Sequence, residues 1–158
     1  MPVRPQHWLP GLVAGQGLID SSGVACTLDY GEIYPFGLLA QVSARFRGPL
    51  SLEKQREIGT QSESYLRNRP ASGPQLTLKQ EGKEGIPGEI VTHEGHNALW
   101  TITYWFEQTV APSAWSLNFN WAEQRLECNF AVSSEQSSLA LDEATELWSA
   151  DAEGYSSA

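Results

Sequence analysis

Residues 100–121 read WTITYWFEQTVAPSAWSLNFNW and hold four of the six tryptophans of the 158-residue chain. Large apolar side chains occupy every second position from 100 to 106, and again from 115 to 121. Side chains of a strand point alternately to opposite faces, so this period of two predicts two strands that each have one apolar face. Burying one such side chain contributes about 1.5–3 kcal/mol. The aromatic residues are therefore expected to fill a core rather than to line a ligand groove.

A third alternating stretch, 126–132, follows a short turn at 122–124 and predicts a three-stranded meander. If the first two strands pair, seven side chains form one continuous apolar layer. They are Trp100, Tyr104, Phe106, Trp115, Leu117, Phe119 and Trp121. A second sheet is expected to cover this layer.

That second sheet is predicted from residues 24–47, which alternate on both sides of a Pro35-Phe36-Gly37 turn. The pattern is typical of a long antiparallel hairpin, in which Gly31 allows a bulge or bend. Both strands have one apolar face and one polar face, which indicates a half-buried sheet.

The remaining segments have weaker signals. Prolines at positions 2, 5 and 10 predict an extended edge segment over 1–17. Polar residues dominate 48–74, which we interpret as a long mobile connection in which Ser51 is positioned to cap a short helix. Short strands are expected at 76–80 and 89–92, and the apolar spacing at 137–149 predicts a C-terminal helix.

These elements predict an all-β protein, a two-layer antiparallel β-sandwich with a short C-terminal α-helix. We expect a single domain over 1–150, followed by a flexible tail at 151–158.

Composition excludes several functional classes. The net charge is −9 and the ten Lys and Arg residues are scattered, so binding to nucleic acid or to anionic membranes is not expected. No apolar run suits a membrane span or a signal peptide, which favours a cytoplasmic location. Cys26 and Cys128 can form one disulfide or none, and in such a compartment two buried thiols are the favoured state.

No catalytic constellation is present in the sequence. His93 and His96 lie three apart in a glycine-containing turn, where alternation does not hold both imidazoles on one face, so they are weak metal candidates and no metal is expected. The candidate carboxylates are not paired by their spacing; they are Asp29, Glu32, Glu107, Glu123 and Glu127. Motifs for nucleophilic catalysis or phosphate binding are missing, so neither catalytic residues nor cofactors are predicted.

Trp105 differs from its aromatic neighbours because it faces the opposite side of its strand, beside Glu107. Either the C-terminal helix covers it or it is exposed. In the exposed case Trp105, Trp8 and Glu107 are the candidate contacts for a ligand or a partner.

The pattern resembles a family of small actinobacterial proteins of uncharacterised function. The resemblance rests on Val24-Ala-Cys-Thr-Leu, on Tyr34-Pro-Phe-Gly, on Tyr104-Trp105-Phe106 and on Asn120-Trp121 before the final helix. Those proteins usually carry Trp-Pro where this chain has Trp121-Ala122. The resemblance implies no activity and supplies no catalytic residue.

Three functions fit the sequence. The favoured one is a non-catalytic interaction or assembly module that binds a protein partner or itself, through a sheet edge or through Trp105. The alternatives are a small-ligand or glycan binder that uses Trp105 or Trp8 for stacking, and an enzyme that uses Glu107, Asp29 or the histidine turn.

Overall fold

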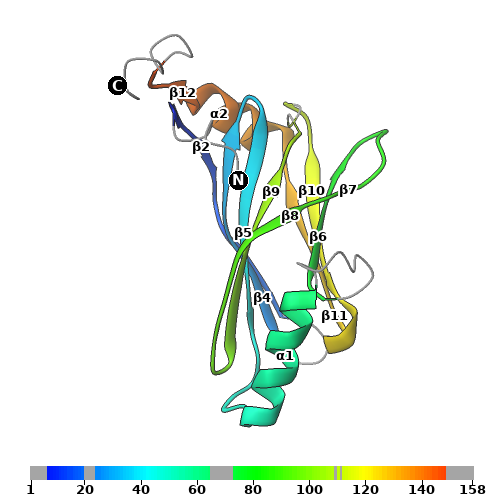
Figure 1. Ribbon diagram of the computed structural model, residues 1–158. Helices are drawn as coiled ribbons and strands as arrows, with labels where there is room; N and C mark the ends of the chain where they lie inside the picture. The colour runs from blue at the N-terminus through cyan, green and yellow to red at the C-terminus, as the bar shows by residue number, and fades with distance from the viewer. Residues whose placement is uncertain (1–6, 20–23, 65–72, 109, 111, 149–158) are drawn as a thin grey trace.

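The computed structural model describes residues 7–19, 24–64, 73–108, 110 and 112–148 and is built around two facing antiparallel sheets (Figure 1). The large sheet has the order β2-β4-β5-β9-β8, with β3 also pairing with β4. The small sheet has the order β11-β10-β6-β7. This architecture confirms the predicted all-β sandwich.

The strand bounds follow the alternating stretches of the sequence. The large sheet contains β2 (Gly11–Val13), β3 (Gln16–Ile19), β4 (Ala25–Tyr34), β5 (Gly37–Arg45), β8 (Glu89–His96) and β9 (Leu99–Phe106). The small sheet contains β6 (Gln75–Gln80), β7 (Ile86–Pro87), β10 (Trp115–Trp121) and β11 (Leu126–Val132). The predicted brief strand at 89–92 is thus longer, because it extends along β9 to His96.

Of the predicted meander, the antiparallel pairing of β10 with β11 is confirmed and the pairing of β9 with β10 is wrong. β9 pairs with β5 and β8 in the large sheet, whereas β10 pairs with β6 and β11 in the small sheet. The aromatic rows of β9 and β10 therefore belong to opposite sheets and meet across the interior. The hairpin of β4 and β5 lies in the same sheet as β9 and does not form a separate covering layer.

The aromatic residues fill the core, as predicted. Every one of the seven side chains of the two aromatic strands is buried, and those of Tyr104, Phe119 and Trp121 have no exposed surface. The Tyr104 hydroxyl donates to the Pro74 carbonyl at 3.0 Å, so its polar atom is satisfied inside the core. Cys26 and Cys128 are buried thiols in opposite sheets, as expected.

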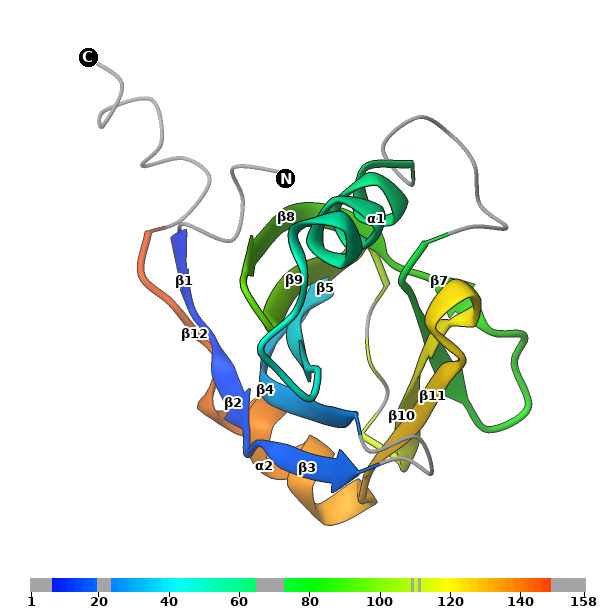
Figure 2. The same cartoon turned by 90° about the horizontal axis from the view of Figure 1, so that it is seen from below.

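Helix α1 (Leu52–Ser64) lies at one end of the sandwich (Figure 2). Ser51 caps it, because its hydroxyl accepts from the Lys54 amide at 3.1 Å. Ile58 is fully buried, and the Gln61 side chain accepts from the Trp121 indole at 3.0 Å. Within the predicted connection over 48–74 this helix is packed against the core, and 65–72 lie outside the described residues.

Helix α2 (Ser134–Glu143) closes the opposite end, where Ala140 joins the core and Ser137 accepts from the Trp115 indole at 3.0 Å. It is shorter than the predicted helix over 137–149, because the chain turns into β12 (Thr145–Glu146). β12 pairs with β1 (Trp8–Leu9), and we name this pair the terminal ribbon. The predicted edge segment at 1–17 is confirmed for its described part, which forms β1, β2 and β3, and the tail at 151–158 lies outside the described residues.

Neither of the two helices, nor any other described segment, combines the length and apolar character that a membrane-crossing helix requires.

Candidate functional site

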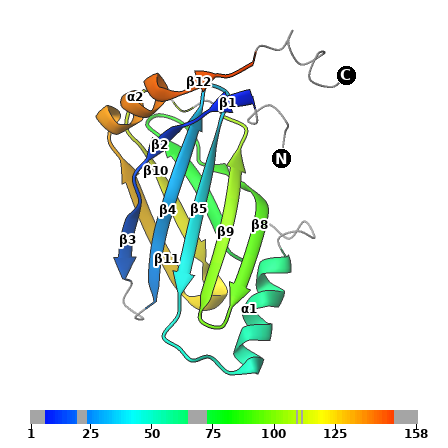
Figure 3. The same ribbon diagram turned by 90° about the vertical axis from the view of Figure 1, so that its left-hand side faces the viewer.

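The outer face of the large sheet, which Figure 3 turns towards the viewer, carries an aromatic cluster at the end nearest the terminal ribbon. The Trp105 ring lies 6.1 Å from the Tyr34 ring and 6.2 Å from the Phe36 ring. The Phe36 ring in turn lies 6.1 Å from the Trp8 ring. Leu39 and Val91 complete this outer cluster.

Trp105 is only 2 % exposed, because this cluster covers it rather than helix α2. Its indole donates to the Glu107 carboxylate, which is exposed. A Cβ on Gly37 would lie 2.4 Å from the Trp105 ring, so the glycine of the Tyr34-Pro-Phe-Gly turn makes room for the indole. The half-buried rings of the cluster are Trp8 and Phe36.

The Tyr34 hydroxyl donates to Glu32 at 2.8 Å, and the pKa of Tyr34 is raised above its ordinary value of 10.0 by burial of the ring and then by this hydrogen bond. Above a pH of about 10 the unfolded chain loses the Tyr34 proton while the folded protein keeps it. The stability that this group contributes is therefore complete below that pH and is lost as the pH rises further. We expect urea unfolding free energies to fall more steeply with alkaline pH for the wild type than for Tyr34→Phe, and parallel profiles would contradict this assignment.

A polar network occupies the middle of the same outer face. Asp29 accepts hydrogen bonds from Thr27 at 2.7 Å, from Gln41 at 3.0 Å and from Ser43 at 2.5 Å. The Tyr30 hydroxyl donates to Gln41 at 3.1 Å, and the pKa of Tyr30 is raised by burial and then by Glu32 and Asp29. A carboxylate held by three neutral donors is fixed in position.

Two β-bulges bracket this network. The register of β4 against β5 shifts between Leu28 and Tyr30, so the bulge lies at Asp29 and not at the predicted Gly31. The register of β8 against β9 shifts between Ile90 and Thr92. Gln41 of β5 pairs with Thr103 of β9, and the two bulges lie in the strands on either side of this pair. The strand pairing is therefore distorted at both ends of this row of residues. Sequence alternation alone gave no sign of this row, since it assigns Asp29 and Tyr30 to opposite faces.

A groove of about 410 Å³ opens on the outer face beside the polar network, and we name it the outer groove. It is lined by Glu94, Gly95, His96, Leu99 and Thr101. Glu94 pairs with Thr101 and His96 pairs with Leu99, so both side chains lie on the outer face. His93 pairs with Ile102 of the core row and lies on the other face, as the alternation predicts.

The predicted carboxylates remain dispersed. Glu32 and Asp29 accept hydrogen bonds on the outer face of the large sheet. Glu123 instead accepts from the Gly73 amide at 2.8 Å, and Glu127 accepts from the Asn118 side chain at 3.4 Å. Among the described residues, no three His, Cys, Asp or Glu side chains come together as a metal centre requires. Within the described part of the chain these predicted carboxylates therefore form no acid–base pair with one another.

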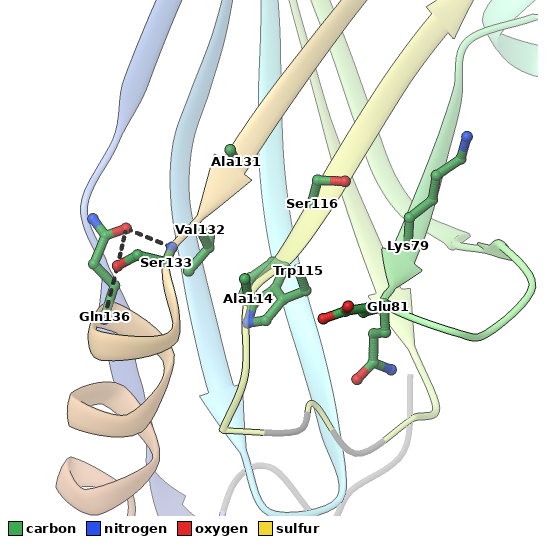
Figure 4. Close-up of a pocket in the computed structure, with 10 residues that line it drawn as sticks. Lys79, Glu81, Ala114, Trp115, Ser116, Ala131, Val132, Ser133 and Gln136 are labelled. Carbon is green, nitrogen blue, oxygen red and sulfur yellow. Dashed lines mark hydrogen bonds between the residues drawn. The ribbon is translucent and has the colours of Figure 1, made fainter.

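A second depression, of about 570 Å³, lies where β6, β10 and β11 meet the start of α2 (Figure 4). Small residues such as Ala114, Ser116 and Ala131 contribute to its lining. The polar side chains on its helix side, Ser133 and Gln136, are engaged with each other in a capping box. Polar side chains also line its strand side: Lys79, Gln80, Glu81 and Ser116.

The terminal ribbon, β2 and α2 lie at one end of the molecule (Figure 3), and these elements and the residues next to them carry exposed apolar side chains. We name this set the end surface, and it consists of Leu9, Leu12, Leu139, Leu147 and Trp148, which are 49–61 % exposed. The amides of Leu147 and Trp148 donate to the His7 carbonyl, which holds the two residues beside β1. Exposed acidic side chains lie next to this surface: Glu135, Asp142, Glu143 and Glu146.

No protein family, curated protein or solved structure matches this chain. The resemblance to small actinobacterial proteins therefore stays a prediction, and the function is argued from the chain's own residues.

Proposed function

We propose that this protein is a non-catalytic interaction module whose protein partner docks on the end surface. One observation carries the proposal: five of the seven large apolar side chains that are exposed in the described part of the chain belong to the end surface. Scattered exposed leucines are ordinary on any protein, whereas a gathering at one end is typical of a docking site.

The terminal ribbon supports a partner that adds a strand. β1 and β12 each have one hydrogen-bonded neighbour within the described residues, so each presents a second strand edge. Edge strands are templates for pairing with another chain. Leu9 and Leu147 supply apolar contacts beside this edge.

Charge supports a basic partner. The chain from 126 to 158 contains seven Asp and Glu residues and no Lys or Arg. A second copy would bring one acidic end against another, which opposes self-association, whereas Lys and Arg on a partner would be attracted. The proposed partner is therefore an extended basic segment that also carries apolar side chains.

The test uses a labelled ten-residue peptide of alternating Leu and Lys, with an alternating Leu and Glu peptide as its acidic counterpart. Fluorescence anisotropy should detect binding of the basic peptide that weakens as salt is added. Because apolar anchors at the centre of an interface dominate affinity, Leu147→Ser with Trp148→Ser should weaken it about tenfold or more.

A matched control replaces two exposed leucines elsewhere, Leu52→Ser with Leu99→Ser, and should leave the affinity unchanged. Glu143→Lys with Glu146→Lys should lower the affinity for the basic peptide and raise the affinity for the acidic one. Equal affinity of both double serine variants, or a dimer by light scattering at micromolar concentration with no peptide binding, would count against a basic partner at this end.

A further inference from the structure

We infer that the outer groove, together with the polar network beside it, is a binding site for a neutral polyhydroxylated ligand such as a monosaccharide or disaccharide. This site lies on the outer face of the large sheet and is separate from the proposed partner site on the end surface. The inference rests on the groove, on the mixed polar groups around it and on their fixed positions.

Two adjacent rows of side chains run through this site, and their residues on β8 and β9 line the groove while those on β5 lie next to it. In one row Arg45 of β5 pairs with Leu99 of β9, which pairs with His96 of β8. In the next row Ser43 pairs with Thr101, which pairs with Glu94. Since alternate positions of a strand share a face, all six side chains lie on the outer face.

The chemistry of these rows favours hydroxyl groups. Sugar hydroxyls both donate and accept, so they fit the Glu94 carboxylate, which accepts, and the Thr101 hydroxyl and His96 imidazole, which can donate and accept. Leu99, at the floor, is 38 % exposed and offers an apolar contact to the C–H face of a sugar ring. The volume of about 410 Å³ lies at the small end of the range for ligand pockets, which suits one or two sugar rings.

The charge of the lining disfavours an anion, because Glu94 contributes a carboxylate to the groove. A neutral polyhydroxylated ligand avoids this repulsion and can bond to Glu94, His96 and Thr101.

The polar network beside the groove is held in place before any ligand arrives. Arg45 donates to Thr27 at 3.1 Å, Thr27 donates to Asp29, and Ser43 lies 3.0 Å from the Thr101 hydroxyl. Ser43 is almost fully buried although it lies on the outer face of the sheet. A network that starts at a bulge and ends at the Thr101 hydroxyl keeps this lining group in position, which lowers the ordering cost of binding.

The experiment is a titration of the full-length, ¹⁵N-labelled chain with D-glucose, D-galactose, N-acetyl-D-glucosamine and cellobiose. At least one sugar should shift amide signals of residues 41–45 and 94–101. Thr101→Val and Glu94→Gln each change a hydrogen-bonding group with little change of shape, and each should lower the affinity for that sugar about tenfold. Unperturbed spectra away from the groove would verify that both variants fold.

The matched control is Ser116→Ala, which removes a hydroxyl from the outer face of the small sheet and should not change sugar affinity. The double variant Leu147→Ser with Trp148→Ser should also keep it, because the end surface is a different site. The inference is overturned if no sugar shifts the groove signals, if putrescine or acetate shifts them while the sugars do not, or if the end-surface variant abolishes sugar binding. Loss of peptide binding with sugar binding intact would instead concern the end surface alone.

Discussion

Gly11→Ala is expected to lower the free energy of unfolding by about 3 kcal/mol or more, because it forces helix α2 away from the large sheet. A Cβ at position 11 would lie 1.6 Å from the Ala140 carbonyl oxygen and 2.3 Å from its carbonyl carbon. These are backbone atoms of a packed helix, so no side-chain rotation relieves the overlap. Denaturant unfolding followed by tryptophan fluorescence would measure the loss.

Gly17→Ala is the matched control, since Gly17 also lies in the N-terminal edge segment. The nearest atom to its added Cβ would be a methyl carbon of Thr27 at 3.6 Å, which is ordinary contact. This variant should stay within about 0.5 kcal/mol of the wild type. Equal stability of the two alanine variants would show that α2 does not pack on Gly11 as described. Because α2 carries Leu139 and many of the exposed acidic side chains, Gly11→Ala should also lower the affinity for the basic peptide.

Trp121→Ala is expected to cost about 3–5 kcal/mol of unfolding free energy, the range for removing a large aromatic side chain from a core. The ring is fully buried, and it lies edge-on to Phe46 with ring centroids 6.0 Å apart. Its indole also donates to Gln61, which connects the small sheet to α1. Calorimetric or denaturant unfolding should therefore measure the lost packing. Amide hydrogen exchange should show weaker protection of the α1 amides.

Two comparisons isolate these contributions. Trp148→Ala removes the same kind of side chain from a site that is 55 % exposed, so its cost should stay below about 1 kcal/mol. Trp121→Phe keeps an aromatic ring but removes the donor to Gln61, and it should lie between the wild type and Trp121→Ala. A Trp121→Ala variant as stable as Trp148→Ala is incompatible with tryptophan serving as core filling in β10.

The strands and the content of the core followed from local alternation. β4, β5, β9, β10 and β11 lie where a period of two separates apolar from polar side chains. The seven aromatic and aliphatic side chains expected to be interior are buried. A half-buried strand needs this alternation whichever strand pairs with it, so the pattern is readable without knowing the partner.

Strand pairing did not follow from the same pattern. β9 and β10 are neighbours in the chain, yet β9 pairs with β5 and β10 with β6. An apolar row is buried equally well next to its neighbour in one sheet or opposite it in two sheets. The end of α2 is a similar case: residues 145–146 pair with β1, and this contact prevails over the helical spacing that continues to Trp148.

The candidate sites depended on tertiary structure even more. The alternation placed Trp105 on the outer face of its strand. The residues that cover it there, Tyr34, Phe36 and Trp8, are distant in sequence. The Asp29 network depends on a bulge that breaks the alternation at that residue. The end surface joins β1 to residues more than a hundred positions later.

By itself the sequence determined which residues form strands, which of their faces are apolar and that the aromatic side chains belong inside, because these properties depend on neighbours two positions away. Only the tertiary structure decided which strands pair, where the bulges bring polar groups together and which apolar side chains stay in water. Those outcomes depend on contacts between distant segments, where many pairings bury similar apolar area and packing of the whole chain selects one.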